Sequence, residues 1–133
     1  MKAISAKVTR GLHIGSLVLA SDNSGARIVR ITGVKRGKSR KGRQQYAKVA
    51  DQVKVSVRAG KPEMKGNVFD AIVIRQRRSF RRLSGERVMF EDNAVALLKD
   101  DKGNPKGTQI KGAVAREVAE RWKAIGKIAQ FVL

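Results

Sequence analysis

The sequence contains no cysteine, one histidine and few aromatic residues. Without cysteine the chain has no disulfide framework and no thiolate ligand for a metal, which fits a reducing cytosol. The first residues hold too short an apolar run for a secretory signal, and no run approaches the roughly 18 apolar residues of a membrane-spanning helix. We therefore expect a soluble, cytoplasmic protein with no membrane partner.

Acidic residues are also scarce. The chain has 11 Asp and Glu against 30 Lys and Arg, which gives a formal net charge of +19. In 133 residues this charge implies strong self-repulsion unless a polyanion is bound. Anionic lipid would require an amphipathic basic helix or a lipid anchor, and neither is evident. The composition therefore predicts a nucleic-acid partner.

The apolar residues are mainly Val, Ile, Leu and Ala in short runs. In the clearest run, VKVSVR (53–58), valines alternate with polar residues, which is the period of a strand with one buried face. Turn sequences such as DNSG (22–25) separate the runs. This pattern predicts one all-β domain over residues 1–133, a small antiparallel sandwich or a barrel, which leaves no exposed strand edge. The other predicted strands are 17–21, 27–31, 68–75, 87–90 and 94–98.

The pattern changes period in AVAREVAERWKAI (113–125). Apolar residues there recur at spacings of four, four and three, which predicts one amphipathic helix packed on the sheet and ending near Gly126. Opposite charges four residues apart, such as Glu117 and Arg121, support a helix. The apolar residues are Val114, Val118, Trp122 and Ile125.

Positive charge is concentrated in two segments. In the first, between Val34 and Val49, seven Lys and Arg residues occur with no acidic residue, and two glycines let the backbone bend. We expect a flexible basic loop over residues 35–48 between two strands. Its basic residues are Lys35, Arg36, Lys38, Arg40, Lys41, Arg43 and Lys48.

The second basic segment, VIRQRRSFRR (73–82), continues an apolar strand, so its arginines have a fixed support. Guanidinium groups can fork two hydrogen bonds onto phosphate, and the chain offers little acidic charge to neutralise them, so a phosphodiester backbone is the expected anion. Phe80 either stacks on an unpaired base or packs against the barrel, and the usual behaviour of single aromatics favours packing. The arginines are Arg75, Arg77, Arg78, Arg81 and Arg82.

RNA suits these loops better than DNA, because the chain has no zinc-ligand spacing, no basic region leading into heptads and no basic recognition helix. A general nucleic-acid chaperone that uses the same loops without a fixed binding site is one alternative. An RNA hydrolase is another, but the only histidine, His13, has no recognisable partner. The adjacent acidic pairs 91–92 and 100–101 are typical of turns, and no phosphate-binding loop is present. The sequence predicts no enzyme and no cofactor.

Three segments together resemble the universal L-fourteen family of large-ribosomal-subunit proteins, in the same order and at the same spacing. They are ASDNSGARIVRI (20–31), VIRQRRSFRRLSGERVMFEDNAVALL (73–98) and PKGTQIKGAVAREV (105–118). The resemblance extends from about Gly15 to the C-terminus. The longer N-terminal segment and the AREVAERW sequence resemble the archaeal and eukaryotic branch.

The resemblance implies a five-stranded β-barrel with a short C-terminal helical segment, bound to large-subunit rRNA. It also implies a bridge to small-subunit rRNA, contacts with neighbouring ribosomal proteins and, in this branch, docking of an anti-association initiation factor near the C-terminus. The segment 75–82 matches the family's main rRNA-contacting element, and Gly107 with Thr108 matches a late Gly-Thr signature. A proline usual before the final helix is replaced by Ala113. Besides the two basic segments, the predicted rRNA-binding residues include Arg27, which matches the family's first hairpin, and Arg30.

Overall fold

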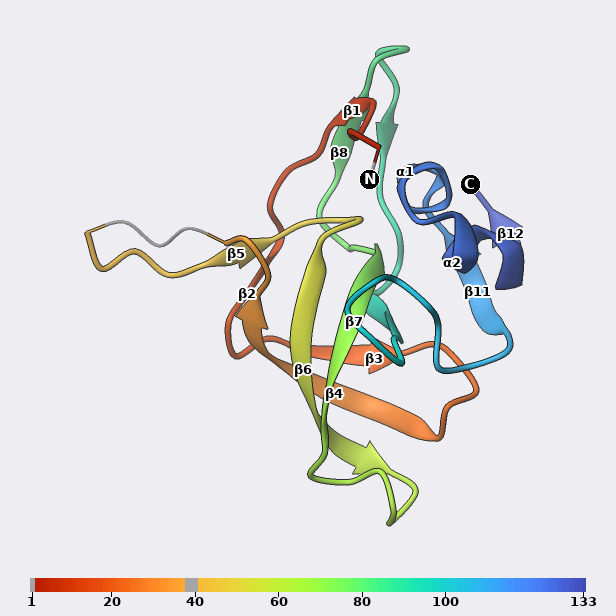
Figure 1. Ribbon diagram of the computed structural model, residues 1–133. Coiled ribbons are helices and arrows are strands. Elements are labelled where there is room, and N and C mark those ends of the chain that lie inside the picture. The colour runs from red at the N-terminus through yellow and green to blue at the C-terminus, as the bar shows by residue number, and fades with distance from the viewer. Residues whose placement is uncertain (1, 38–40) are drawn as a thin grey trace.

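The computed structural model describes residues 2–37 and 41–133, and its central feature is a closed barrel of five strands (Figure 1). The strands follow one another around the barrel in the order β10-β3-β4-β6-β7. The predicted all-β fold and barrel are confirmed. The strands are β3 (Leu17–Ala20), β4 (Ala26–Val34), β6 (Gln52–Gly60), β7 (Val68–Arg75) and β10 (Ala94–Leu97).

One pair of barrel strands is parallel, contrary to the expected antiparallel arrangement. β3 pairs with β10 in parallel, with Leu19 opposite Ala94, whereas the other four neighbouring pairs are antiparallel. A closed ring with an odd number of strands cannot alternate direction throughout, so one parallel pair is unavoidable. It lies where the last strand of the barrel meets the first.

Burial explains the sequence patterns of the strands. Val53, Val55 and Val57 of β6 are all buried inside the barrel, as their period of two predicts. β7 and β10 are instead buried on both faces: Val73 belongs to the barrel interior, and its neighbour Ile74 to a second core cluster under the C-terminal segment. This is why VFDAIVIR reads as a continuous apolar run rather than an alternating one.

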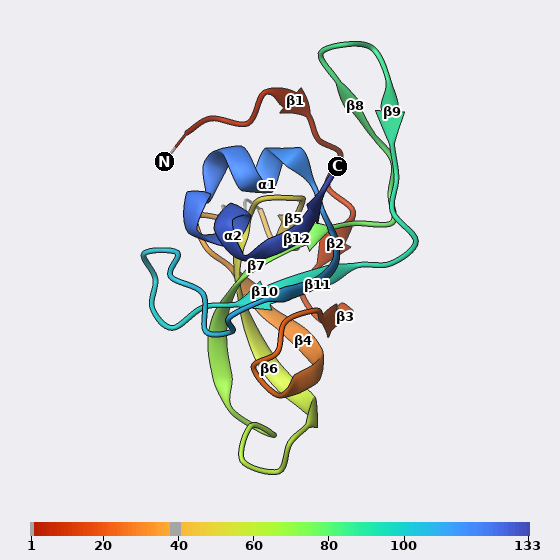
Figure 2. The same ribbon diagram turned by 90° about the vertical axis from the view of Figure 1, so that its right-hand side faces the viewer.

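The C-terminal segment packs on the barrel through this second cluster (Figure 2). It consists of β11 (Ile110–Val114), α1 (Arg116–Arg121), α2 (Lys123–Ile128) and β12 (Ala129–Val132), and β11 pairs with β12 in parallel. Neither of these two helices, the ones found in the described residues, is long and apolar enough to cross a membrane.

The predicted C-terminal helix is therefore present as two short helices, not as one helix over 113–125. The backbone leaves helical geometry at Trp122 (φ −119°, ψ 84°), and residues 113 and 114 belong to β11. Gly126 lies within α2 rather than at a helix end, and a Cβ there would come within 3.1 Å of the Ala119 Cβ. The two helices thus approach each other closely at this glycine.

Two small sheets extend the barrel. β1 (Ala6–Lys7), β8 (Phe80–Arg82) and β9 (Arg87–Val88) form one sheet, and β8 and β9 are the strands of a hairpin that projects from the barrel (Figures 1 and 2). β2 (Leu12–His13) pairs with β5 (Tyr46–Ala47), which lies at the end of the predicted basic loop. Both basic segments therefore emerge from the same barrel.

Candidate nucleic-acid interface

The arginine-rich segment begins inside the barrel and runs out along the projecting hairpin. Arg75 is the last residue of β7, and Phe80 begins β8. The Phe80 side chain is fully buried in the cluster that also holds Val118 and Ile125. The predicted packed position of Phe80 is confirmed, so its ring is not available to stack on a base.

Arg75 is buried, and its guanidinium group is held entirely by the protein. Nε and one terminal nitrogen donate to the two carboxylate oxygens of Asp92, the second at 3.0 Å. The terminal nitrogens also donate to the Ser21 hydroxyl (2.8 Å) and to the carbonyls of Lys111 (3.1 Å) and Ala113 (3.0 Å). The Arg75 hydrogen bond lowers the pKa of Asp92 below its usual value. Arg75 thereby ties β7 to β11.

Arg82 is buried in the same manner. Its Nε donates to Glu117 Oε1 at 2.7 Å and a terminal nitrogen donates to Oε2 at 3.3 Å, a forked pair between the hairpin and α1. That terminal nitrogen also donates to the Leu133 carbonyl. Only 9% of the Arg82 side chain and 4% of the Glu117 side chain are exposed. Glu86, four residues along, adds a longer contact at 3.7 Å.

The expectation that the chain supplies little acidic charge for this cluster is therefore wrong for Arg75 and Arg82. Both were predicted to bind rRNA, and both are instead occupied by ion pairs within the protein. Their carboxylate partners lie 17 and 35 residues away in the sequence, so no local pattern reveals them. Gln76 between them is also structural: its buried amide bonds the backbone of Thr9, Val49 and Arg78.

The other three arginines of the segment are different. Arg77, Arg78 and Arg81 are exposed, and within the described residues their guanidinium groups make no hydrogen bond or ion pair. The backbone beneath them is fixed, since the Arg77 N–H donates to Asn93 Oδ1 at 2.8 Å and Arg81 pairs with Lys7 and Arg87 across the small sheet. They are the uncompensated charges of this segment.

The predicted basic loop follows β4, and the short strand β5 lies near its end, before β6. Arg36, Lys41 and Arg43 are exposed, and Lys48 is half-buried. Lys35 is also exposed and forms an ion pair with Asp101 at 3.3 Å. Two predicted binding residues, Lys38 and Arg40, lie outside the described residues.

Arg27 and Arg30 lie on β4 and are exposed, between residues that point into the barrel. Arg30 is paired with Leu17 of β3, which is also exposed. These two arginines therefore project from the outer surface of the barrel wall. The structure does not bring them into the projecting hairpin.

The first predicted turn is locked to the late Gly-Thr signature. Asn23 Nδ2 donates to the Thr108 hydroxyl at 2.7 Å, and the Thr108 N–H donates to Asn23 Oδ1 at 2.8 Å. A Cβ at Gly107 would lie 2.6 Å from Asn23 Oδ1, so any larger residue there would push the Asn23 side chain out of place. Asp22 accepts the N–H of Leu97 at 2.9 Å. These motif residues hold two distant turns together.

None of the weighed catalytic residues forms a recognisable site. His13 is exposed, and its Nδ1 donates to the carbonyl of Ile14 at 2.8 Å. Asp100 is a turn residue whose pKa is lowered by hydrogen bonds, first from the Asn104 side chain and then from the Lys102 N–H. Among the residues described, no group of three or more His, Asp or Glu is placed to hold a metal ion.

Comparisons with known proteins agree with the family resemblance of the sequence motifs. A profile of the family described as "Ribosomal protein L14p/L23e" matches residues 11–133. The chain is 53% identical to "Large ribosomal subunit protein uL14" of Nanoarchaeum equitans, over 133 residues that cover 100% of both chains. The proteins of the same name from Halobacterium salinarum and Methanothrix thermoacetophila are 47% and 46% identical, again over 100% of both chains. All three relatives are archaeal, in agreement with the predicted archaeal and eukaryotic branch.

Proposed function

The chain belongs to the L14p/L23e family of ribosomal proteins, and we propose that its projecting hairpin and basic loop anchor it to the rRNA of the large subunit. As a member of this family it is a non-enzymatic structural constituent of the large ribosomal subunit, and it acts in the cytoplasm, on the ribosome. The proposal concerns how it is held there.

The main support for this proposal is that the arginine-rich segment contains two kinds of arginine. Arg75 and Arg82 are satisfied inside the protein, whereas Arg77, Arg78 and Arg81 have no internal counter-charge within the described residues. Exposed arginines on a rigid hairpin suit forked contacts to phosphate, which fix register and orientation on folded RNA. Anchored by the two buried pairs, the hairpin keeps its shape in the free protein, so little ordering entropy is lost on binding.

The basic loop is the second proposed contact with rRNA. Lys35, Arg36, Lys41 and Arg43 are exposed, and Gly42 has a positive φ of 73° that lets the loop turn sharply. We assign the loop, including Lys38 and Arg40, to adjacent rRNA. Arg27 and Arg30, on the outer barrel wall, complete the proposed contact set.

The C-terminal segment is proposed to face the small subunit. Its last residues, Phe131, Val132 and Leu133, are apolar and roughly half exposed, which is typical of a surface covered by a partner. The proposed partners are small-subunit rRNA at a bridge, neighbouring large-subunit proteins and an anti-association initiation factor. The family resemblance supports this placement.

The test is binding of the purified protein to a folded large-subunit rRNA fragment, with charge reversal at Arg77 and Arg81. We expect R77E/R81E to lose most of its affinity while its circular dichroism stays that of wild type. Arg58→Glu is the matched control, because Arg58 is exposed on β6 and belongs to neither basic segment. If six to ten phosphates are contacted, wild-type affinity falls about 10³- to 10⁵-fold between 50 and 200 mM salt.

Two outcomes would contradict the proposal. If R77E/R81E binds as well as R58E, the hairpin is not the main contact. If wild type binds an unstructured RNA of the same length as tightly as the folded fragment, a general chaperone describes the activity better than a fixed rRNA contact.

A further inference from the structure

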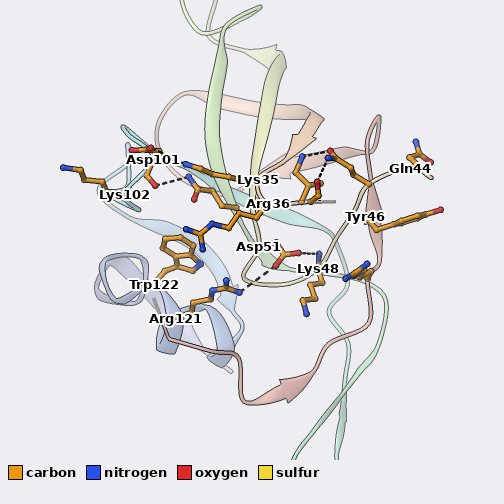
Figure 3. A pocket seen from close by; sticks show the side chains of 15 residues that line it. Lys35, Arg36, Gln44, Tyr46, Lys48, Asp51, Asp101, Lys102, Arg121 and Trp122 are labelled. Atoms are coloured by element: carbon orange, nitrogen blue, oxygen red, sulfur yellow. Dashed lines mark hydrogen bonds and ion pairs between the residues drawn. The ribbon is translucent and has the colours of Figure 1, made fainter. Parts of the chain in front are cut away.

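A cleft of about 740 Å³ separates the basic loop from the C-terminal helices (Figure 3). One wall is formed by Lys35 and Arg36 after β4, and the other by Arg121 and Trp122, where α1 meets α2. Asp51, just before β6, lies between them. This volume is that of a typical small-ligand site rather than a gap left by one missing side chain.

The cleft is lined with cations that lack partners. Arg10, Arg36, Lys48 and Lys102 line it, and none of their side chains forms an ion pair with the described residues. The carboxylates in the lining do not remove this excess. Asp101 is already paired with Lys35, and Asp51 with Arg121. The cleft therefore has a net charge suited to an anion.

Arg121 is the most unusual residue of the lining. Its Nε is buried and makes no hydrogen bond to the described residues, and its only carboxylate contact, to Asp51 Oδ1, is long at 3.9 Å. A buried donor without an acceptor is unfavourable, so the Arg121 guanidinium group is incompletely satisfied by the described residues. Burial raises the pKa of Asp51 although the Lys48 N–H donates to its Oδ2 at 3.1 Å, and Oδ1 has only the long contact to Arg121 among the described residues. Arg121 and Asp51 thus form a loose ion pair in the cleft lining.

Trp122 adds a flat apolar surface beside these polar groups. Its Nε1 donates to the Ala50 carbonyl at 2.9 Å, which fixes the ring next to Asp51. Gly103 packs against the six-membered ring so closely that a Cβ would lie 2.7 Å from it, so the ring cannot swing away. In Figure 3 the side chains of Arg36 and Trp122 point toward one another across the cleft. A half-buried indole held rigidly beside arginines is the arrangement that stacks nucleic-acid bases.

We propose that this cleft binds one unpaired nucleotide of RNA, with its phosphate against Arg36 and Arg121 and its base against Trp122. This inference rests on the proposed RNA-binding function and adds a specific site to it. A nucleotide supplies both an anion and a planar ring, and it can offer amino donors to Asp51 as well. A carboxylate side chain of a neighbouring protein would satisfy Arg121 alone and would leave most of the cleft empty.

The chain's single tryptophan is Trp122, so its fluorescence reports on this cleft directly. The full-length protein is titrated with a single-stranded adenylate hexamer, with hexaglutamate and with tripolyphosphate. We expect saturable quenching by the adenylate hexamer, and competition without comparable quenching by tripolyphosphate. R36Q and R121Q should each weaken the hexamer about tenfold, since each loses hydrogen bonds to a charged group. The matched control R58Q should leave it unchanged.

Binding to the large-subunit rRNA fragment is measured in parallel, so that the two proposals fail separately. If wild type binds the fragment but the adenylate hexamer does not quench Trp122, the cleft proposal is wrong and the hairpin proposal stands. Quenching that R36Q and R121Q leave intact, or stronger quenching by hexaglutamate, would also overturn the cleft proposal. If R77E/R81E loses the fragment but keeps hexamer quenching, the cleft is shown to act independently of the hairpin.

Discussion

Some arginines of the arginine-rich segment are buried in ion pairs and others are exposed, so substitutions at the neighbouring Arg81 and Arg82 should have very different effects on stability. Arg82→Ala leaves the Glu117 carboxylate, 4% exposed, without its forked partner, and it also removes a donor to the Leu133 carbonyl. Breaking a buried ion pair on one side typically costs about 3–5 kcal/mol of unfolding free energy. Arg81→Ala removes an exposed side chain, so its effect should stay within about 0.5 kcal/mol.

Urea unfolding followed by circular dichroism measures both variants at a fixed salt concentration. At this chain length the Arg82→Ala loss corresponds to a fall in Tm of about 10–20 °C. Replacing both partners, as Arg82→Met with Glu117→Leu, should recover much of the stability, because no unpaired charge remains buried. If Arg82→Ala is no less stable than Arg81→Ala, the claim that Arg82 is a structural residue is refuted.

Two further predictions concern the contacts that hold the barrel to its C-terminal segment. Asp92→Asn should cost about 1 kcal/mol at neutral pH, since it weakens a charge-assisted hydrogen bond from Arg75 at a partly exposed site. Because the folded-state pKa of Asp92 is lowered, wild type has this extra stability above the ordinary Asp pKa of 3.8 and loses it as pH falls through the folded-state pKa. The stabilities of wild type and Asp92→Asn should therefore converge in acid. Stability curves that stay parallel over this pH range would contradict the pairing of Asp92 with Arg75. Gly107→Ala should cost about 1–3 kcal/mol in thermal unfolding, because its Cβ would displace Asn23 from Thr108; unchanged stability would show that the turn relaxes freely.

The barrel strands could be predicted because each carries its own local signal. Val53, Val55 and Val57 alternate with polar residues, and turn residues separate the runs. The relative direction of β3 and β10, which close the barrel, carries no such signal, since the pairing of Leu19 with Ala94 joins segments far apart in the sequence. The number of strands would have sufficed: five strands in a ring require one parallel pair.

The sequence predicts one C-terminal helix where the structure has two, because the period of apolar residues does not show where a helix breaks. The spacing of Val118, Trp122 and Ile125 continues through residue 122, and all three pack on one core cluster. The break arises from tertiary contacts: the Trp122 indole reaches the Ala50 carbonyl, and Gly126 lets α2 pack against Ala119. The expected pair of Glu117 with Arg121 is absent for the same reason, as each binds a residue outside the helix, Arg82 and Asp51 respectively.

The predicted rRNA-contacting arginines could not be sorted from sequence into those held inside the protein and those left exposed. Five arginines in ten residues look alike until the carboxylates of Asp92 and Glu117 are brought beside two of them. The neutral Gln76 inside the run was the one local hint, because a buried amide there marks where the strand is still part of the core. The cleft at Trp122 had no sequence signal, since its walls are far apart in the chain.

The most direct test of the account is the sedimentation of a tagged copy from a cell lysate, with the ribosomal peaks washed at high salt before blotting. The account predicts that wild type stays on the large subunit in stoichiometric amount, whereas R77E/R81E is absent from it and R58E is retained. Retention of R77E/R81E at the wild-type level would contradict the claim that the exposed hairpin arginines anchor this protein to rRNA.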